Sequence, residues 1–286
     1  MKRVSLRRIM IALLALLFLG SAAFFGHQLY QYHLGEQVYS EAEKLAQLPD
    51  LTQIREPEPP APAASSSASS SAAVTASSQA PADEPSQPVY VDPYADALRS
   101  MDFAALREVN DDVLGWILIP NTRLSYPLLQ GEDNEYYLNR TWKKSRNSVG
   151  AIFLECRSSP DLSDFNTIVY GHRMNNRSMF GILLNYKDQN YWEKHPTFYI
   201  TDDNGSHAYD VFAAYEVGVT QPTYRLEVTE EADKQAVLDF CVEQSVLDTG
   251  IVPTPADRIV TLSTCTGQGH ETRWVVQGVL RTETAS

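Results

Sequence analysis

Residues 258–281 read RIVTLSTCTGQGHETRWVVQGVLR, in which two apolar, β-branched runs flank a glycine-containing turn. The runs 258–264 and 273–281 have the composition of β-strands, and the segment between them is typical of a tight connection. We therefore predict a hairpin-like pair of strands here, with Cys265 at the end of the first one.

Six more runs of the same kind precede this pair. They are separated by Gly, Pro, Asn and Asp, and they cover residues 113–119, 124–129, 151–155, 167–170, 197–201 and 209–220. Eight short strands within about 170 residues are the pattern of a closed barrel or a sandwich. The fold class that we expect is mainly β with peripheral helices.

Two helices are expected beside these strands. Residues 94–109 carry apolar side chains near helical spacing. Residues 229–246 are the clearest helical segment, because Thr229 is suited to cap it and acidic residues fill its first turn.

The N-terminal segment has the features of a membrane anchor. Residues 9–25 carry no charge, and as a helix they span roughly 25 Å, close to the thickness of a bilayer core. Basic residues gather in residues 1–8 and no acidic residue precedes Glu36, so the positive-inside rule leaves the N-terminus cytoplasmic and the rest outside. The alternative is a cleaved signal peptide, for which Ser21-Ala22-Ala23 supplies small residues near a cleavage site.

Three further segments follow the anchor. Residues 26–55 are expected to form a juxtamembrane helical segment, and residues 56–88 are dominated by Pro, Ser and Ala without an aromatic side chain. Such a stretch buries too little apolar surface to fold, so we interpret it as a linker that holds the domain on the order of 30 Å from the membrane. Residues 90–286 form the one expected globular domain.

Composition excludes several classes of protein. The chain has 286 residues and a net charge of −13, and it has no basic run outside its first eight residues, which argues against nucleic-acid binding. Three cysteines are too few for a disulfide-rich scaffold or a four-cysteine zinc site.

Cys265 is the strongest candidate for a nucleophile. It ends a predicted strand beside a glycine-containing turn, where a thiol can face a cleft. Cys241 lies among apolar residues of the 229–246 segment and Cys156 follows an apolar strand, so both are interpreted as structural. A disulfide between these two stays open, because the sequence does not fix its geometry.

A cysteine nucleophile needs a proton-transfer partner and a donor for the oxyanion. His172 follows the strand 167–170 and begins a polar loop, while His195, His207 and His270 are interpreted as surface, capping or solvent-exposed residues.

Arg273 begins the last predicted strand, eight residues after Cys265. Across a hairpin-like loop, that spacing can bring its guanidinium beside the thiol. A guanidinium is always charged and has five donors, which suits it to an oxyanion.

The segments around Cys265, His172 and Arg273 together resemble those of a known family. The run Thr261-Leu-Ser-Thr-Cys265, with Arg273 eight residues on, is similar to the active-site signature of sortases. Further segments resemble class B of this family and follow each other in the order found there. They are Asn110–Ile119, Tyr126–Gln130, Asn134–Leu138, Gly150–Glu155, Tyr170–Met174 and Met179–Gly181. Glu155 and Arg173 depart from the usual pattern, where Asp and Asn are common.

The resemblance implies a closed β-barrel of seven or eight strands and the activity of a cysteine transpeptidase. Cys265 would attack the carbonyl of a C-terminal sorting motif, Arg273 would stabilise the oxyanion, and His172 would transfer protons. Ser263 and Thr266 are expected to contact the substrate. The scheme requires no metal or organic cofactor.

The implied partners are secreted proteins of a Gram-positive cell and an amine acceptor. The acceptor is either a peptidoglycan precursor of the cell wall or a pilin lysine, and the sequence does not choose between wall anchoring and pilus assembly. Two alternatives remain beside the sortase: an L,D-transpeptidase, whose Ser-x-Gly before the cysteine is missing here, and a catalytically idle scaffold or adhesion domain.

Overall fold

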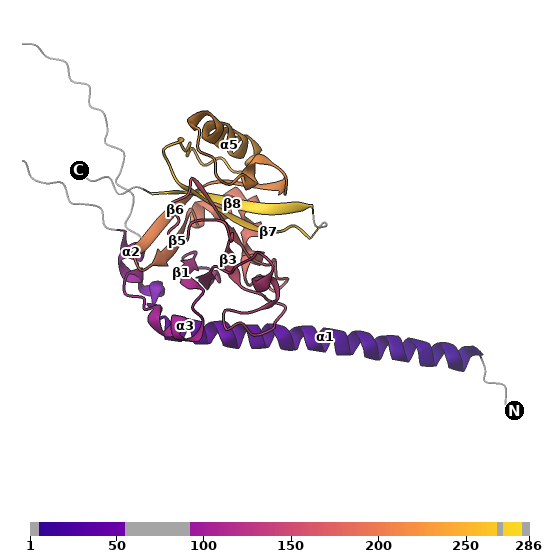
Figure 1. The fold of residues 1–286 in the computed structure, drawn as a ribbon. Helices are drawn as coiled ribbons and strands as arrows, with labels where there is room; N and C mark the ends of the chain where they lie inside the picture. The colour runs from indigo at the N-terminus through magenta and orange to yellow at the C-terminus, as the bar shows by residue number, and fades with distance from the viewer. Residues whose placement is uncertain (1–5, 55–91, 268–270, 282–286) are drawn as a thin grey trace, which may run out of the picture.

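Eight strands form a closed barrel in the computed structural model, which describes residues 6–54, 92–267 and 271–281 (Figure 1). The strands are β1 (Val113–Leu118), β2 (Ser125–Leu129), β3 (Ile152–Leu154), β4 (Asn166–Tyr170), β5 (Thr197–Asp202), β6 (Gly205–Gly218), β7 (Ile259–Cys265) and β8 (Thr272–Leu280). They close in the order β1-β2-β3-β4-β7-β8-β6-β5. The prediction of eight strands in a closed barrel is confirmed, with ends that differ by a few residues.

The two faces of β7 are both buried, but against different layers. Val260 and Leu262 point into the main core of the barrel. Ile259 belongs instead to a second apolar cluster on the outside of the wall, together with residues of helix α5 (Glu231–Gln244). Because side chains alternate along a strand, Ser263 and Cys265 follow Ile259 on the outer face.

The expected helix over residues 94–109 is two short helices, α2 (Pro93–Leu98) and α3 (Ala104–Val109). Asp102 separates them: its carboxylate accepts the backbone N–H of Ala104 at the start of α3, while its own N–H donates to the carbonyl of Ala46. Helix α2 has already ended at Leu98, and these two bonds of Asp102 turn the chain before α3 begins.

Helix α5 begins two residues later than the predicted segment. Its N-cap residue is Glu230, whose side chain makes no capping hydrogen bond, so the expectation that Thr229 caps the helix is wrong. Glu231 and Asp233 nevertheless lie in the first turn, where the helix dipole favours negative charge. The other short helices are α4 (Gln189–Lys194) and the 3₁₀ segments η1 (Leu51–Gln53), η2 (Tyr136–Asn139), η3 (Phe180–Lys187) and η4 (Pro222–Tyr224).

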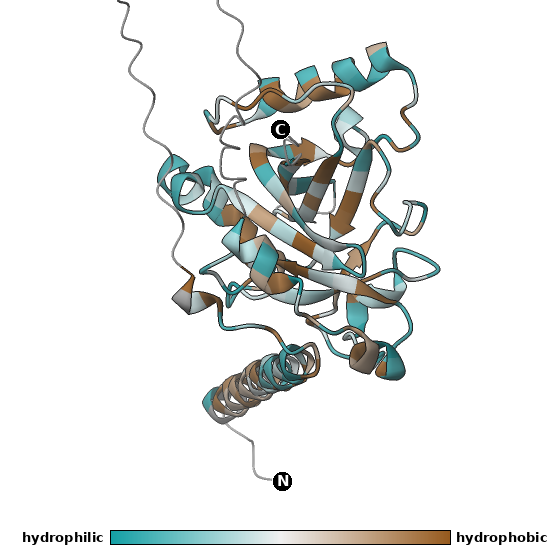
Figure 2. Cartoon of the chain, turned by 90° about the vertical axis from the view of Figure 1, so that its left-hand side faces the viewer, coloured by the Kyte–Doolittle hydropathy of each residue, from teal (hydrophilic) through white to brown (hydrophobic). Residues whose placement is uncertain are grey.

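Helix α1 (Leu6–Leu45) is continuous from the apolar segment to the barrel. By length and composition it is able to cross a membrane, and it lies below the barrel in Figure 1 and nearly end-on in Figure 2. Its C-terminal half packs on the segment between β2 and β3: Tyr39 donates to the carbonyl of Gly150, and Trp142 Nε1 donates to the carbonyl of Val38 at 2.8 Å.

Direct contact between α1 and the barrel changes the expected role of the linker. Tyr39, Ala42 and Ala46 of α1 are buried against the domain. These contacts, and not the linker, therefore set the distance between α1 and the domain. The expected distance on the order of 30 Å between the domain and the membrane stays a prediction. The linker itself, residues 56–88, lies outside the described residues.

An ion-pair network joins the two ends of the domain. Arg281, just after β8, donates to Asp92 at the start of α2 at 2.7 Å and to Asp210 on β6 at 3.0 Å. Burial opposes the charge of Arg281, but the hydrogen bonds and negative charge of Asp210 outweigh it and raise the pKa of the guanidinium. The side chains of Asp92 and Asp210 are 11% and 27% exposed.

Replacing Arg281 by Met is expected to lower the free energy of unfolding by about 2 kcal/mol, because two partly buried carboxylates lose their counter-charge. Urea unfolding of the full chain measures this. The matched control is Arg258→Met, at an exposed arginine, for which the expected change is within about 0.5 kcal/mol. Equal free energies of unfolding for the two variants would contradict a stabilising role for the ion pairs of Arg281.

Candidate active site

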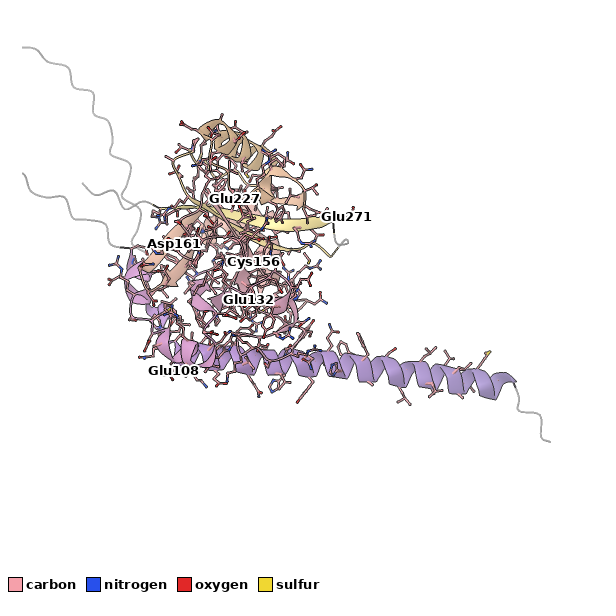
Figure 3. The ribbon with its side chains drawn as sticks, viewed as in Figure 1. Glu108, Glu132, Cys156, Asp161, Glu227 and Glu271 are labelled. Carbon is pink, nitrogen blue, oxygen red and sulfur yellow. The ribbon has the colours of Figure 1, made fainter. Side chains whose placement is uncertain are left out.

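Three neighbouring strands bring the predicted catalytic residues to one end of the barrel. The strands β4, β7 and β8 are adjacent in the sheet. His172 follows β4 by two residues, Cys265 is the last residue of β7, and Arg273 is the second residue of β8. Figure 3 marks this end by Glu271, which directly precedes β8.

Cys265 and Arg273 lie directly opposite each other. They are the last paired residues of the antiparallel ladder between β7 and β8. Opposed residues in such a ladder place their side chains on the same face, with Cβ atoms about 4.5–5.5 Å apart. The hairpin spacing recognised in the sequence therefore puts a guanidinium next to the thiol, on the outer face of the barrel.

His172 comes to the same place through a parallel ladder. Tyr170 pairs with Ser263, and the N–H of Gly171 donates to the carbonyl of Ser263 at 3.2 Å. Extending this register by two residues sets His172 opposite Cys265. Because side chains alternate along a strand, the side chain of His172 lies on the same outer face as that of Tyr170.

The imidazole of His172 is held by the segment that precedes β3. Nε2 donates to the carbonyl of Leu138, so this nitrogen carries the proton in that bond. Gly150 has a φ of +62° and lies so close that a Cβ there would be 2.7 Å from Cδ2 of the imidazole. Glycine is therefore required at position 150 for both conformation and space.

Tyr224 lies against the strand that ends at Cys265. It comes from η4, in the connection between β6 and β7, and its hydroxyl lies 2.7 Å from Ser263 Oγ. Burial raises the pKa of Tyr224 to about 12, although its hydrogen bond to Ser263 and the positive charge of Arg273 oppose the rise. The hydroxyl is thus tied to β7 two residues before Cys265.

The base of the loop between β7 and β8 is tied down by Arg173. Its guanidinium donates to the carbonyl of Thr266, and a Cβ on Gly267 would collide with the same group. The Thr266 hydroxyl lies 3.0 Å from that of Thr272. Arg173, which stood out only as a departure from the family pattern, fixes the residue that follows Cys265.

The two predicted substrate-binding residues are largely buried. Ser263 is 2% exposed and bonds to Tyr224, while Thr266 is 8% exposed and holds the loop. Their role in binding stays a prediction.

The other cysteines are free thiols in different surroundings. Burial raises the pKa of Cys241, which is fully buried in the outer apolar cluster. Burial and the neighbouring negative charge of Glu155 raise the pKa of Cys156. Cys241 lies in α5, and Cys156 follows β3, which runs antiparallel to β4 and therefore ends away from the end of β4 that leads to His172. The label of Cys156 in Figure 3 lies away from that of Glu271.

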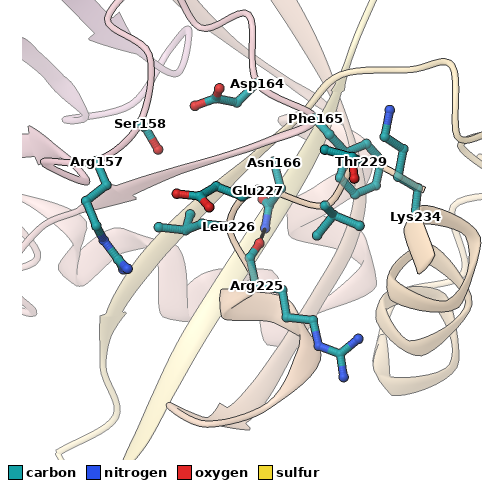
Figure 4. Close-up of a pocket in the computed structure, with 11 residues that line it drawn as sticks. Arg157, Ser158, Asp164, Phe165, Asn166, Arg225, Leu226, Glu227, Thr229 and Lys234 are labelled. Atoms are coloured by element: carbon teal, nitrogen blue, oxygen red, sulfur yellow. Dashed lines mark hydrogen bonds between the residues drawn. The ribbon is translucent and has the colours of Figure 1, made fainter. Parts of the chain in front are cut away.

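A cavity of about 340 Å³ lies further along the same strands (Figure 4). Its lining includes Arg157, Asn166 and Arg225. Asn166 pairs with Ile259, six residues before Cys265 on β7, which is a separation of about 20 Å along the strand. The cavity is therefore separate from the Cys265 end.

The family model of the sortase domain matches residues 117–281, which include the end of β1 and all of the later strands. The chain belongs to the sortase family. Sortases are cysteine transpeptidases, so this chain is a cysteine transpeptidase of the sortase type.

Its relatives indicate class B. The chain is 37% identical to Sortase B of Listeria monocytogenes over 180 residues, which cover 62% of this chain and 73% of that protein. It is 35% identical to Sortase B of Staphylococcus aureus over 170 residues, which cover 59% of this chain and 70% of that protein.

Solved structures agree with this placement. A Staphylococcus aureus sortase B–substrate complex superimposes with a TM-score of 0.60 and 33% identity, covering 63% of this chain and 84% of that one. Sortase B from B. anthracis in complex with AAEK1 gives a TM-score of 0.64 and 25% identity, covering 88% of this chain and 98% of that one.

Proposed function

We propose that this sortase is a membrane-anchored, extracellular enzyme in which Cys265, His172 and Arg273 carry out acyl transfer from a sorting motif to an amine. The observation that supports this assignment is the register of β4, β7 and β8, which brings these three residues to one end of the barrel. The two other cysteines of the described residues lie elsewhere, Cys156 just after β3 and Cys241 in α5.

In the first half of the reaction, the Cys265 thiolate attacks the scissile carbonyl of the sorting motif. An ordinary cysteine is only a few per cent thiolate at pH 7, so nearby positive charge assists. Arg273, opposite Cys265 on β8, donates to the oxyanion of the tetrahedral intermediate. One such donor is worth about 2.7–4 kcal/mol in related acyl-transfer chemistry.

His172 acts on the amine in each half of the reaction. It gives a proton to the leaving amine as the thioester forms, and it accepts a proton from the incoming amine that attacks the thioester. The bond from Nε2 to Leu138 fixes one ring nitrogen, which leaves Nδ1 for this transfer. The thiol is then released, and the new amide joins the substrate to its acceptor.

Helix α1 is the anchor in this proposal. With the basic residues 1–8 in the cytoplasm, the barrel lies outside. The end of the barrel at which β7 ends and β8 begins points the same way as the N-terminal half of α1 (Figure 1). The reacting groups therefore face the membrane surface, where a newly translocated substrate arrives.

The substrate is a secreted protein with a C-terminal motif that resembles Asn-Pro-x-Thr, and the acceptor is an amine. One solved Staphylococcus aureus structure is a sortase B–substrate complex, and another sortase B structure is complexed with triglycine. A short glycine peptide supplies an N-terminal amine, which is the chemistry of a wall-peptide acceptor. A lysine of a pilin is the second acceptor that the proposal tests.

The test incubates the full chain in detergent with a library of sorting peptides, and with triglycine or Nα-acetyl-lysine amide as the amine. We expect an acyl adduct on Cys265 by peptide mass mapping and a ligated product with one amine. Product with triglycine supports wall anchoring, and product with the lysine amine supports pilus assembly. Peptide turnover without any adduct on Cys265 overturns the assignment of the nucleophile.

A further inference from the structure

A second cavity, of about 500 Å³, lies between α1 and the loop that leads into β3. Its lining comes from two segments, and the residues are Phe24, His27, Gln28 and Gln31 of α1 with Asn139, Arg146, Asn147 and Ser148 of the loop. None of these residues is acidic, although the chain as a whole has a net charge of −13.

The helix sets the depth of this cavity. Phe24 lies at the outer end of the uncharged segment 9–25, and Gln28 and Gln31 follow on the same face, one and two turns further on. From Phe24 to Gln31 the helix rises about 10 Å, which is enough to cross the headgroup region on one side of a bilayer. With residues 9–25 in the bilayer core, the cavity lies at the level of the outer headgroups.

The loop is fastened along the helix and descends towards the membrane. Trp142 bonds to the carbonyl of Val38, and Asn147 Nδ2 bonds to the carbonyl of Gln31 at 3.1 Å, two turns nearer the membrane. The Asn147 side chain also accepts the N–H of Val149. These bonds give the cavity a wall of fixed shape.

Arg146 is the cation that this wall carries to the headgroup level. The neighbouring Lys143 pairs with Glu41, and Lys144 pairs with Asp111. Arg140 lies over the ring of Tyr136. Within residues 6–54, 92–267 and 271–281, Arg146 makes no ion pair, and its side chain is exposed.

We propose that this cavity binds the phosphate of an anionic membrane lipid headgroup. The guanidinium of Arg146 matches a phosphate bidentately, and Ser148, Gln28 and Gln31 supply neutral donors. Phe24 at the inner edge contacts the start of the acyl chains. This inference rests on the proposed insertion of α1 in the membrane.

A bound headgroup lies next to the support of the catalytic histidine. Asn139 follows Leu138, whose carbonyl accepts the bond from His172, and Ser148 lies two residues before Gly150, which packs on the same imidazole. The lipid therefore fills the space between α1 and the segment that orients His172.

The test uses the full chain in neutral detergent micelles with added phosphatidylglycerol, and native mass spectrometry counts the lipids retained. We expect Arg146→Gln to weaken retention of the tightest phosphatidylglycerol at least tenfold, because one charge-assisted bidentate contact is lost. The matched control, Arg258→Gln, removes an exposed arginine far along the chain and is expected to leave retention unchanged. Equal retention by both variants overturns the proposal.

Two further experiments distinguish a lipid headgroup from free phosphate and test the membrane insertion of α1 by itself. Inorganic phosphate at the same concentration is expected not to displace the lipid, and full displacement would assign the site to free phosphate and overturn the lipid proposal. Vesicle flotation with carbonate extraction tests the membrane insertion of α1 independently. Loss of insertion contradicts the anchor, whereas insertion with unchanged lipid retention in Arg146→Gln contradicts the headgroup site alone.

Discussion

Replacing Cys265 by Ala is expected to abolish acyl transfer, with a fall in turnover of at least about 10⁴-fold. In the proposed mechanism the thioester forms on this sulfur, and no other thiol lies at the ends of β4, β7 and β8 in the described residues. Barrel stability is expected to change little, because Cys265 is only half-buried at the end of its strand. Product formation and adduct mass are measured together.

The matched control for this variant is Cys156→Ala. Cys156 is also partly exposed, but its neighbour Glu155 disfavours the thiolate, and it lies on a different loop. We expect it to keep wild-type turnover. An adduct that persists in Cys265→Ala and disappears in Cys156→Ala would reverse the assignment. Full function of Cys265→Ala in the cell would favour an idle scaffold.

Replacing Arg273 by Ala is expected to lower kcat about 10²–10³-fold, the usual cost of losing one oxyanion donor. KM is expected to change much less, because the oxyanion exists only in the transition state and the intermediate. Arg273→Lys keeps the charge but loses the planar fork, so it should recover only part of the activity. Steady-state kinetics with the sorting peptide measure both parameters.

Arg173 provides the comparison, since it is a second arginine close to Cys265. Its guanidinium bonds to a backbone carbonyl, that of Thr266, and this leaves it a positioning residue. Arg173→Ala is expected to lower activity less than tenfold and mainly to raise KM, through a looser loop. A large fall in kcat for Arg173→Ala, with none for Arg273→Ala, would instead assign the oxyanion donor to Arg173.

The strands were predictable because their signal is local. Each of the eight runs is rich in apolar, β-branched or aromatic residues and lies between turn residues, which indicates a closed barrel or a sandwich. The resemblance to the sortase family decided for the barrel. The break between α2 and α3 was missed, because it depends on the contact of Asp102 with Ala46, which is far away in the sequence. Local periodicity carries no record of such a contact.

Within the site, the pair of Cys265 and Arg273 was predictable from hairpin spacing, and their register agrees with it. The supports of His172 were not predictable. Leu138 and Gly150 lie 34 and 22 residues before it, and Tyr39 acts on Gly150 from a separate helix. A glycine at positive φ leaves a trace in the sequence only as one glycine among fourteen.

The unbroken course of α1 has a consequence for which proteins can be processed. Residues 26–45 form a stiff rod of roughly 30 Å that is bonded to the barrel at Val38 and Tyr39. In the proposed orientation, with α1 in the membrane, this rod holds Cys265 at a constant height above the bilayer. We then expect a substrate to be selected by two features at once: the sequence of its motif, and the number of residues that separate this motif from its own hydrophobic tail.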